Sequence, residues 1–87
     1  MNNYLFIIDL PSSTMNVYHN EHGIYYMERI PPNEMAVPHR IGGPAVIHRD
    51  GTEEYYERGV RHRANGPAVV YTDGRPPEYW VNGRRTR

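Results

Sequence analysis

The chain has 87 residues, no cysteine, and ten basic against ten acidic residues, which gives a formal net charge of zero. This length suits one small domain, covering residues 1–87, that buries roughly 60% of the surface its unfolded chain would expose. The lack of cysteine excludes disulfide bridges and thiolate zinc sites, and the lack of a long apolar run or a signal-peptide pattern predicts a cytoplasmic protein with no membrane partner.

The first expected element is a strand. The apolar run from Tyr4 to Leu10 contains β-branched residues and ends at a Pro-Ser-Ser turn sequence, which predicts a buried strand and a loop over residues 1–15. A weak echo of a later repeat follows over residues 16–30, and the three prolines of residues 31–38 disfavour a central strand. Residues 16–38 are therefore predicted to be a degenerate repeat followed by a Pro-rich loop, or at most by one helical turn.

The rest of the chain contains two copies of one sequence. The segment from His39 to Gly51 returns from His62 to Gly74, 62 − 39 = 23 positions later, and after one inserted residue the match resumes at an offset of 24. Self-similarity at such a period is typical of repeat architectures, in which each unit buries its apolar face against its neighbour. The sequence is therefore divided into repeats and a tail: residues 39–60, residues 61–83 and an Arg-rich tail at residues 84–87.

Each repeat has the pattern of a β-hairpin. A Gly-Pro pair precedes a run of strand formers, and Asp50-Gly51 and Asp73-Gly74 supply the residues that a type I′ turn requires. Asn82-Gly83 is a further hairpin signal, after which the tail is expected to pair back as a short strand. No window has helical periodicity, so we predict an all-β fold, a meander of stacked hairpin repeats in a single twisted antiparallel sheet. Alternation predicts an apolar face that includes Val46, Val69, Tyr56 and Trp80.

A known family has a similar pattern. The succession Gly-x-x-His-Arg-x-x-Gly-Pro-Ala, then Asp-Gly, an aromatic residue and Gly, resembles a variant of the MORN hairpin repeats. Here it is carried by Gly59, His62-Arg63, Gly66-Pro67-Ala68, Asp73-Gly74 and Asn82-Gly83. The resemblance implies a scaffold for protein contacts. Short proteins similar to this one occur in phages and bacteria, so the resemblance also implies a concrete role as a phage-encoded inhibitor of a bacterial defence system, of the anti-CRISPR type, that occludes a partner surface.

The histidines favour a structural role over metal binding. His19-x-x-His22 has a spacing that imidazole ligands can use, but His39 and His62 share one repeat position. At that position we expect a ring nitrogen to bond a turn carbonyl and the following Arg to reach a carboxylate. The sequence therefore predicts no metal site and no cofactor.

The acids also give no catalytic pattern. Glu53, Glu54 and Glu57 are expected on a solvated strand, and no hydroxyl has an evident base in the sequence. His48 is replaced by Tyr71 in the next copy, so the scaffold is expected not to require it. We therefore predict that the protein is not an enzyme and has no catalytic residue.

Residue types common at interfaces are the strongest functional signal. The chain has eight Tyr and one Trp, and its ten basic residues are all Arg. Tyr and Arg are enriched at interface hot spots. The formal charge is −5 over residues 1–57 (3 − 8) and +5 over residues 58–87 (7 − 2), a separation that can steer a charged partner. We predict a non-enzymatic module that binds a protein, with the partner-binding residues Tyr55, Arg58, Arg63, Tyr79, Arg84 and Arg85.

Two other functions stay open at this point. The basic C-terminal part has the Arg and Tyr residues that stack on unpaired bases, although zero net charge disfavours a nucleic acid as the partner. An exposed strand edge can also pair with itself, which would make the chain a homo-oligomeric structural module.

Overall fold

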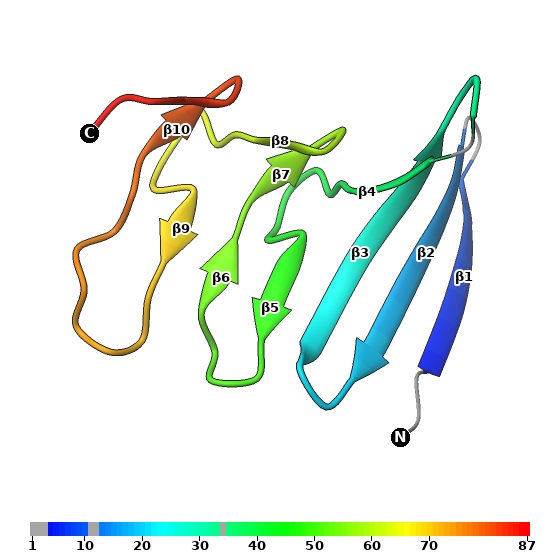
Figure 1. Cartoon of the computed structure of the whole chain (residues 1–87), viewed down its shortest axis with the longest axis horizontal. Helices are drawn as coiled ribbons and strands as arrows, with labels where there is room; N and C mark the ends of the chain where they lie inside the picture. Colours follow the sequence, from blue (N-terminus) through cyan, green and yellow to red (C-terminus); the bar gives the residue numbers. More distant parts are fainter. Residues whose placement is uncertain (1–3, 11–12, 34) are drawn as a thin grey trace.

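The computed structural model describes residues 4–10, 13–33 and 35–87, with side chains from residue 16 onward. These residues form strands joined by turns and loops, and the strands follow one another from one end of the molecule to the other (Figure 1). The all-β prediction is therefore confirmed, and none of the described segments is a helix that could cross a membrane. The strands are β1 (Tyr4–Leu10), β2 (Ser13–Asn20), β3 (Gly23–Ile30), β4 (Met35–Pro38), β5 (Val46–His48), β6 (Glu53–Glu54), β7 (Tyr56–Glu57), β8 (Val60–Arg61), β9 (Val69–Val70), β10 (Trp80–Val81) and β11 (Arg84–Arg85).

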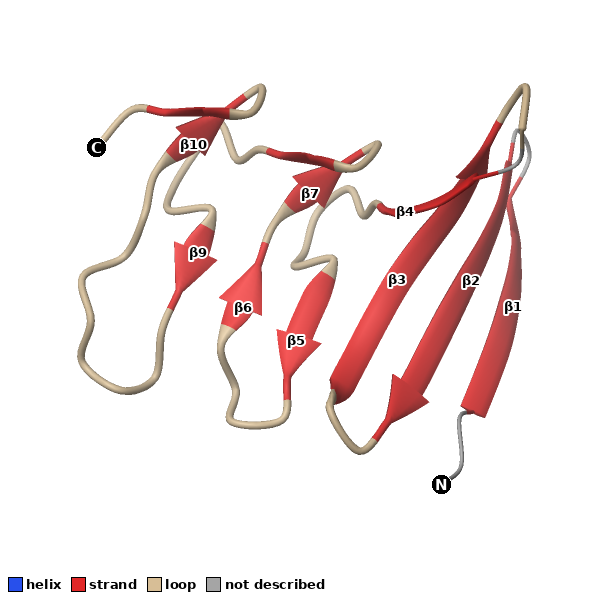
Figure 2. Ribbon diagram, in the orientation of Figure 1, coloured by secondary structure: helices blue, strands red, loops and turns tan. Residues whose placement is uncertain are grey.

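The strands pair in a repeating way. Three long strands, β1 to β3, form a meander, and the repeats add much shorter strands separated by loops (Figure 2). β4 and β5 lie end to end along one edge of β3, where β4 pairs with Met27–Ile30 and β5 with Gly23–Tyr25. β8 and β9 have the same relation to β7 and β6. Each unit is thus a strand, a tight turn, a short returning strand, a Gly-Pro loop and a second returning strand.

The sheet is divided more than the sequence predicts. A seven-stranded sheet has the order β1-β2-β3-β5-β6-β9, with β4 also on β3, while β7–β8 and β10–β11 each form a two-stranded sheet. The described residues therefore contain three sheets where one was expected. Tyr55 separates β6 from β7. Its N–H donates to Ala68 O at 2.8 Å, so backbone hydrogen bonding continues across the break between the two sheets.

The N-terminal part bears out one prediction and overturns two. β1 has the predicted bounds, and it lies at an edge of the sheet with β2 as its partner. The side chains of this strand, and Pro11 and Ser12 of the expected loop, lie outside the described part of the chain, so the expected burial stays a prediction. Ser13 already belongs to β2, and Met35–Pro38 form β4 instead of a loop. β4 tolerates proline because Pro38 is its last residue, and the N–H of His39 then continues the ladder by donating to Tyr26 O at 2.9 Å.

The turns differ from the predicted types in an informative way. Both residues of Asn82-Gly83 have positive φ (50° and 80°), as a type I′ turn requires, and β11 pairs back as predicted. Arg58-Gly59 has the same conformation (52° and 81°), although Arg is an unusual residue there. The type I′ prediction is wrong for both Asp50-Gly51 and Asp73-Gly74, because only the glycines have positive φ (94° and 90°). The first of these loops closes through bonds from Gly51 N to His48 O and from His48 N to Thr52 O. This is a three-residue hairpin loop with Gly in the left-handed position.

The buried core is small and repeats with the sequence: among the described side chains its apolar members are Val17, Ala45, Val46, Ala68 and Val69. Val46 pairs with Glu54, and Glu54 pairs with Val69, so these three residues share one face of the sheet. The predicted apolar face is therefore wrong in one respect, since a carboxylate lies between its two valines. Tyr56 and Trp80 are half-buried instead of fully packed in the core.

Candidate functional site

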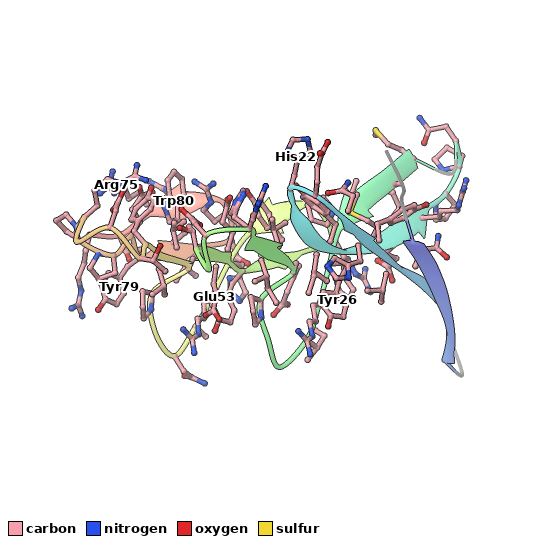
Figure 3. All side chains as sticks on the ribbon, turned by 90° about the horizontal axis from the view of Figure 1, so that it is seen from below. His22, Tyr26, Glu53, Arg75, Tyr79 and Trp80 are labelled. Atoms are coloured by element: carbon pink, nitrogen blue, oxygen red, sulfur yellow. The ribbon has the colours of Figure 1, made fainter. Side chains whose placement is uncertain are left out.

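The two faces of the sheet carry different side chains. Seen along its edge, the ribbon has Tyr26, Glu53 and Tyr79 on one side and Trp80 and Arg75 on the other (Figure 3). The loops that follow β4 and β8, drawn in green and yellow, project on the side of Tyr26 and Tyr79. We call this side the loop face, and the opposite side, which carries the carboxylate of Glu54, the network face.

The network face is organised around Glu54. Its carboxylate accepts hydrogen bonds from Tyr56 Oη at 2.7 Å and Arg61 Nη2 at 2.6 Å, and its Oε2 lies 2.5 Å from His48 Nε2. Burial raises the pKa of Glu54, but these three contacts outweigh burial and hold the pKa below its ordinary value. The side chain of Glu54 is only 16% exposed, so the expectation that it lies on a solvated face is wrong.

The next repeat builds the same arrangement around Glu78. Tyr71 Oη and Trp80 Nε1 donate to this carboxylate at 2.5 and 2.9 Å, and Arg61 Nη1 lies 3.8 Å from it. Tyr71 thus takes the place of His48, so the position is used by the scaffold although its residue type changes. This corrects the expectation that the scaffold does not require it. Arg61 links the two carboxylates and therefore the two repeats.

The chemistry available on the network face is limited. His48 and Glu54 have the geometry of a base with an orienting carboxylate, but no hydroxyl of a described residue bonds the imidazole. The open cavity above them has a volume of about 390 Å³ and is lined by His48, Arg49, Asp50, Thr52, Glu54, Arg61, Val69, Tyr71 and Arg75. Within the described residues, no three His, Asp or Glu side chains are grouped to hold a metal ion. The contacts of this face explain how the repeats pack.

The loop face carries a row of stacked arginine and tyrosine pairs. The Arg40 guanidinium carbon lies 4.0 Å from the Tyr26 ring centroid, and that of Arg63 lies 4.0 Å from the Tyr55 centroid. Arg87 continues the row at 4.7 Å from Tyr79. A guanidinium over an aromatic face within about 6 Å is attracted by the ring quadrupole. Each repeat therefore fixes one arginine against an aromatic residue of the preceding strand.

The Gly-Pro pair of each repeat completes this contact. Arg40 Nη1 donates to Pro44 O at 3.3 Å, and Arg63 Nη1 donates to Pro67 O at 3.1 Å. A Cβ on Gly43 would lie 2.9 Å from the Arg40 guanidinium carbon, so a side chain at this position would displace the arginine. The pattern Arg-x-x-Gly-Pro thus encodes a guanidinium held between a ring and a glycine, with a carbonyl at its edge. The expectation that these arginines reach carboxylates is wrong.

The repeat histidines hold the tight turns. His39 Nδ1 accepts a hydrogen bond from the backbone N–H of Arg58 at 2.8 Å, and His62 Nδ1 accepts one from Asn82 N–H at 2.9 Å. The prediction that these histidines bond to a turn is therefore confirmed. The predicted partner is wrong, because the ring nitrogen accepts from a backbone N–H and does not bond a carbonyl. Each histidine acts on the turn that follows its own position by about twenty residues, which joins one unit to the next.

A cleft lies between the two projecting loops. It has a volume of about 300 Å³ and is lined by Arg40, Gly42, Gly43, Tyr55, Glu57, His62, Arg63, Ala64 and Asn65. Ile41 stands beside Arg40 in the first loop and is 70% exposed, the largest exposure among the exposed large apolar side chains described. Neither Arg40 nor Arg63 forms an ion pair with another described residue. The cleft therefore contains two guanidiniums that form no ion pair with a described residue, and the loop that lines it also carries an exposed apolar side chain.

The structure separates the six sequence-predicted site residues. Tyr55 and Arg63 meet in the cleft, and Tyr79 lies on the same face against Arg87. Arg85 pairs with Trp80 of the network face, while Arg58 and Arg84 are exposed at or beside tight turns. The sequence-based set therefore does not form one surface.

The prediction also missed residues of the cleft and of the loop that lines it. Arg40 could have been found, since it has the same repeat position as Arg63. Ile41 occupies the repeat position that Ala64 has in the next copy. This difference between the copies could have indicated Ile41 as a candidate functional residue. Glu57 was identified only as part of an acidic strand.

The C-terminal tail matches the start of a repeat. Gly83 to Arg87 align with Gly59 to Arg63 at an offset of 24. The N–H of Thr86 donates to Tyr79 O at 2.7 Å, as the N–H of His62 donates to Tyr55 O at 3.0 Å. The tail therefore repeats the first residues of a unit, and this is why Arg87 extends the row of stacked arginines.

Comparisons with known proteins give no match to this chain among protein-family models, curated proteins or solved structures.

Proposed function

We propose that the protein is a non-enzymatic module that binds a protein partner through its loop face. The observation that carries this proposal is the cleft between the two Gly-Pro loops, with stacked Arg40 and Arg63 in its lining and the exposed Ile41 beside it. Arginine and tyrosine are enriched at protein interfaces, and a rigid arginine loses little side-chain entropy on binding.

The scaffold supports this role. Two similar loops leave the same face, one from each repeat, so a partner that fits the cleft contacts both units at once. We propose that the repeat is MORN-like, because the Arg-x-x-Gly-Pro-Ala and Asp-Gly motifs stand at the same spacing in both copies. The proposed form of action is occlusion of a partner surface, as in a phage-encoded inhibitor of a bacterial defence system.

The test is affinity capture with a matched pair of variants. Ile41→Asp places a charge in the loop that lines the cleft, between Arg40 and Gly42, and Met35→Asp places the same charge at another exposed apolar residue, 53% accessible and in β4, no residue of which lines the cleft. We expect a partner captured by the wild-type chain from its native host to be lost with Ile41→Asp and kept with Met35→Asp. Equal capture by both variants would show that the partner does not bind through the loop that carries Ile41.

A further inference from the structure

We propose that the cleft recognises a carboxylate side chain of an acidic segment on the partner, which Arg40 and Arg63 hold between them. This inference rests on the proposed function, because it names the chemistry of the segment that the loop face binds. Its basis is the placement of both guanidiniums in one cleft, where neither forms an ion pair with a described residue.

Both guanidiniums are held in position before any ligand arrives. Each has a tyrosine ring about 4.0 Å from its carbon and a glycine backbone near it, and each gives one N–H to a proline carbonyl. A guanidinium has five N–H donors, and no other hydrogen bond from Arg40 or Arg63 side chains occurs in the described part of the chain. The remaining donors of a planar group match the two oxygens of a carboxylate.

The charge of the cleft favours a single negative group. Its lining contains Arg40 and Arg63 against Glu57, which sums to +1 (2 − 1) with His62 neutral. A nucleic acid draws its affinity from many phosphate contacts, which this lining and a chain of zero net charge do not supply. Ile41 lies between two lining residues, Arg40 and Gly42, and its exposed side chain offers an apolar contact to a part of the partner outside the cleft. An acidic peptide segment with a neighbouring apolar residue is therefore the occupant that the surface fits.

The test uses the full chain and two synthetic probes. The probes are the blocked peptides acetyl-Gly-Glu-Leu-Gly-amide and acetyl-Gly-Gln-Leu-Gly-amide, titrated into isotope-labelled protein in the millimolar range and observed by NMR. We expect the Glu peptide to shift the side-chain Nε–Hε signals of Arg40 and Arg63 and the amide of Gly42. The Gln peptide should leave these signals in place, because it keeps the shape and lacks the charge.

Variants sharpen the assignment. Arg40→Gln should weaken binding of the Glu peptide roughly tenfold, which corresponds to about 1.4 kcal/mol. Arg49→Gln removes an equal charge from the opposite face and should bind the peptide as the wild type does. If Arg40→Gln does not fold, Glu57→Gln decides, since removal of the acid in the cleft should tighten binding by about twofold to fivefold.

Three results would overturn the proposal. These are absence of shifts with the Glu peptide, equal shifts with both peptides, or stronger shifts of the same signals by oligothymidylate than by the Glu peptide, which would assign the cleft to a phosphodiester backbone. The titration needs no natural partner, so it fails or succeeds separately from the capture experiment. If Ile41→Asp abolishes capture of the partner but the Glu peptide causes no shifts, the proposed function holds and the carboxylate is not the ligand of the cleft.

Discussion

The imidazole of His62 accepts a hydrogen bond through Nδ1 from the backbone N–H of Asn82, 2.9 Å away in the turn of the next hairpin. His39 has the same relation to Arg58 at 2.8 Å. In each case a residue near the start of one Gly-Pro loop fixes the turn of the unit that follows. The units are therefore joined by polar contacts as well as by the buried alanine and valine pairs, and neither unit is complete alone.

Removal of this acceptor should destabilise the fold. His62→Ala leaves the Asn82 N–H to bond water, and we expect the free energy of unfolding to fall by about 0.5–1.5 kcal/mol. Urea denaturation measures this change. His22→Ala is the matched control, since that side chain is 71% exposed, and it should change stability by less than about 0.5 kcal/mol. Equal effects of the two substitutions would contradict the role of the His62 ring.

The two type I′ turns predict opposite effects of a residue exchange. Arg58 has φ of 52°, in the left-handed region that Asn and Gly tolerate better than Arg. Arg58→Asn should therefore raise the free energy of unfolding by about 0.5–1 kcal/mol, and Asn82→Arg should lower it by a similar amount. Thermal unfolding of both variants tests the pair. A loss of stability in Arg58→Asn would mean that the arginine side chain stabilises its own turn.

Much of the fold could be predicted because the repeat is visible in the sequence. The period, the first strand and the Asn82-Gly83 turn follow from local patterns that tertiary contacts do not override. β4 could not be predicted from the sequence, because proline disfavours a strand in general. The sequence does not show that Pro38 is the last residue of the strand or that the N–H of His39 continues the backbone hydrogen bonding. The Asp50-Gly51 turn was misassigned because Asp-Gly suits both two-residue and three-residue hairpin loops.

The contacts between side chains were harder to predict than the strands. An alignment of the copies at an offset of 24 places Glu54 with Glu78 and Tyr56 with Trp80, which is the signal for the network face. The sequence does not say that Arg61 reaches both carboxylates, because that depends on how closely the repeats stack. Arg63 was expected at a partner surface, and its contact with a ring and a proline carbonyl is likewise a product of the loop conformation.

The network face predicts that stability depends on pH. Contacts hold the pKa of Glu54 below its ordinary value of 4.5, so its charged form is favoured in the folded state. Its contribution is therefore fully present above about pH 4.5 and is lost as the pH falls through the lowered folded-state pKa. Urea denaturation over the acidic range should show a smaller loss in Glu54→Gln than in the wild type. Glu53→Gln, on the opposite face, should retain the wild-type dependence, and a flattened curve in that variant instead would contradict the assignment.

The stacked pair Tyr55 and Arg63 predicts an interaction energy that a double-mutant cycle can measure. With the guanidinium carbon 4.0 Å from the ring centroid, Tyr55→Leu and Arg63→Gln should couple by about 0.5–1 kcal/mol in the free energy of unfolding. Tyr55→Phe should keep most of this coupling, because the ring and not the hydroxyl makes the contact. Tyr55→Leu combined with Arg49→Gln, an arginine of the opposite face, should be additive. Additivity in the first cycle as well would mean that the ring and the guanidinium stabilise the loop independently, and Arg63 would then owe its position to the Pro67 carbonyl alone.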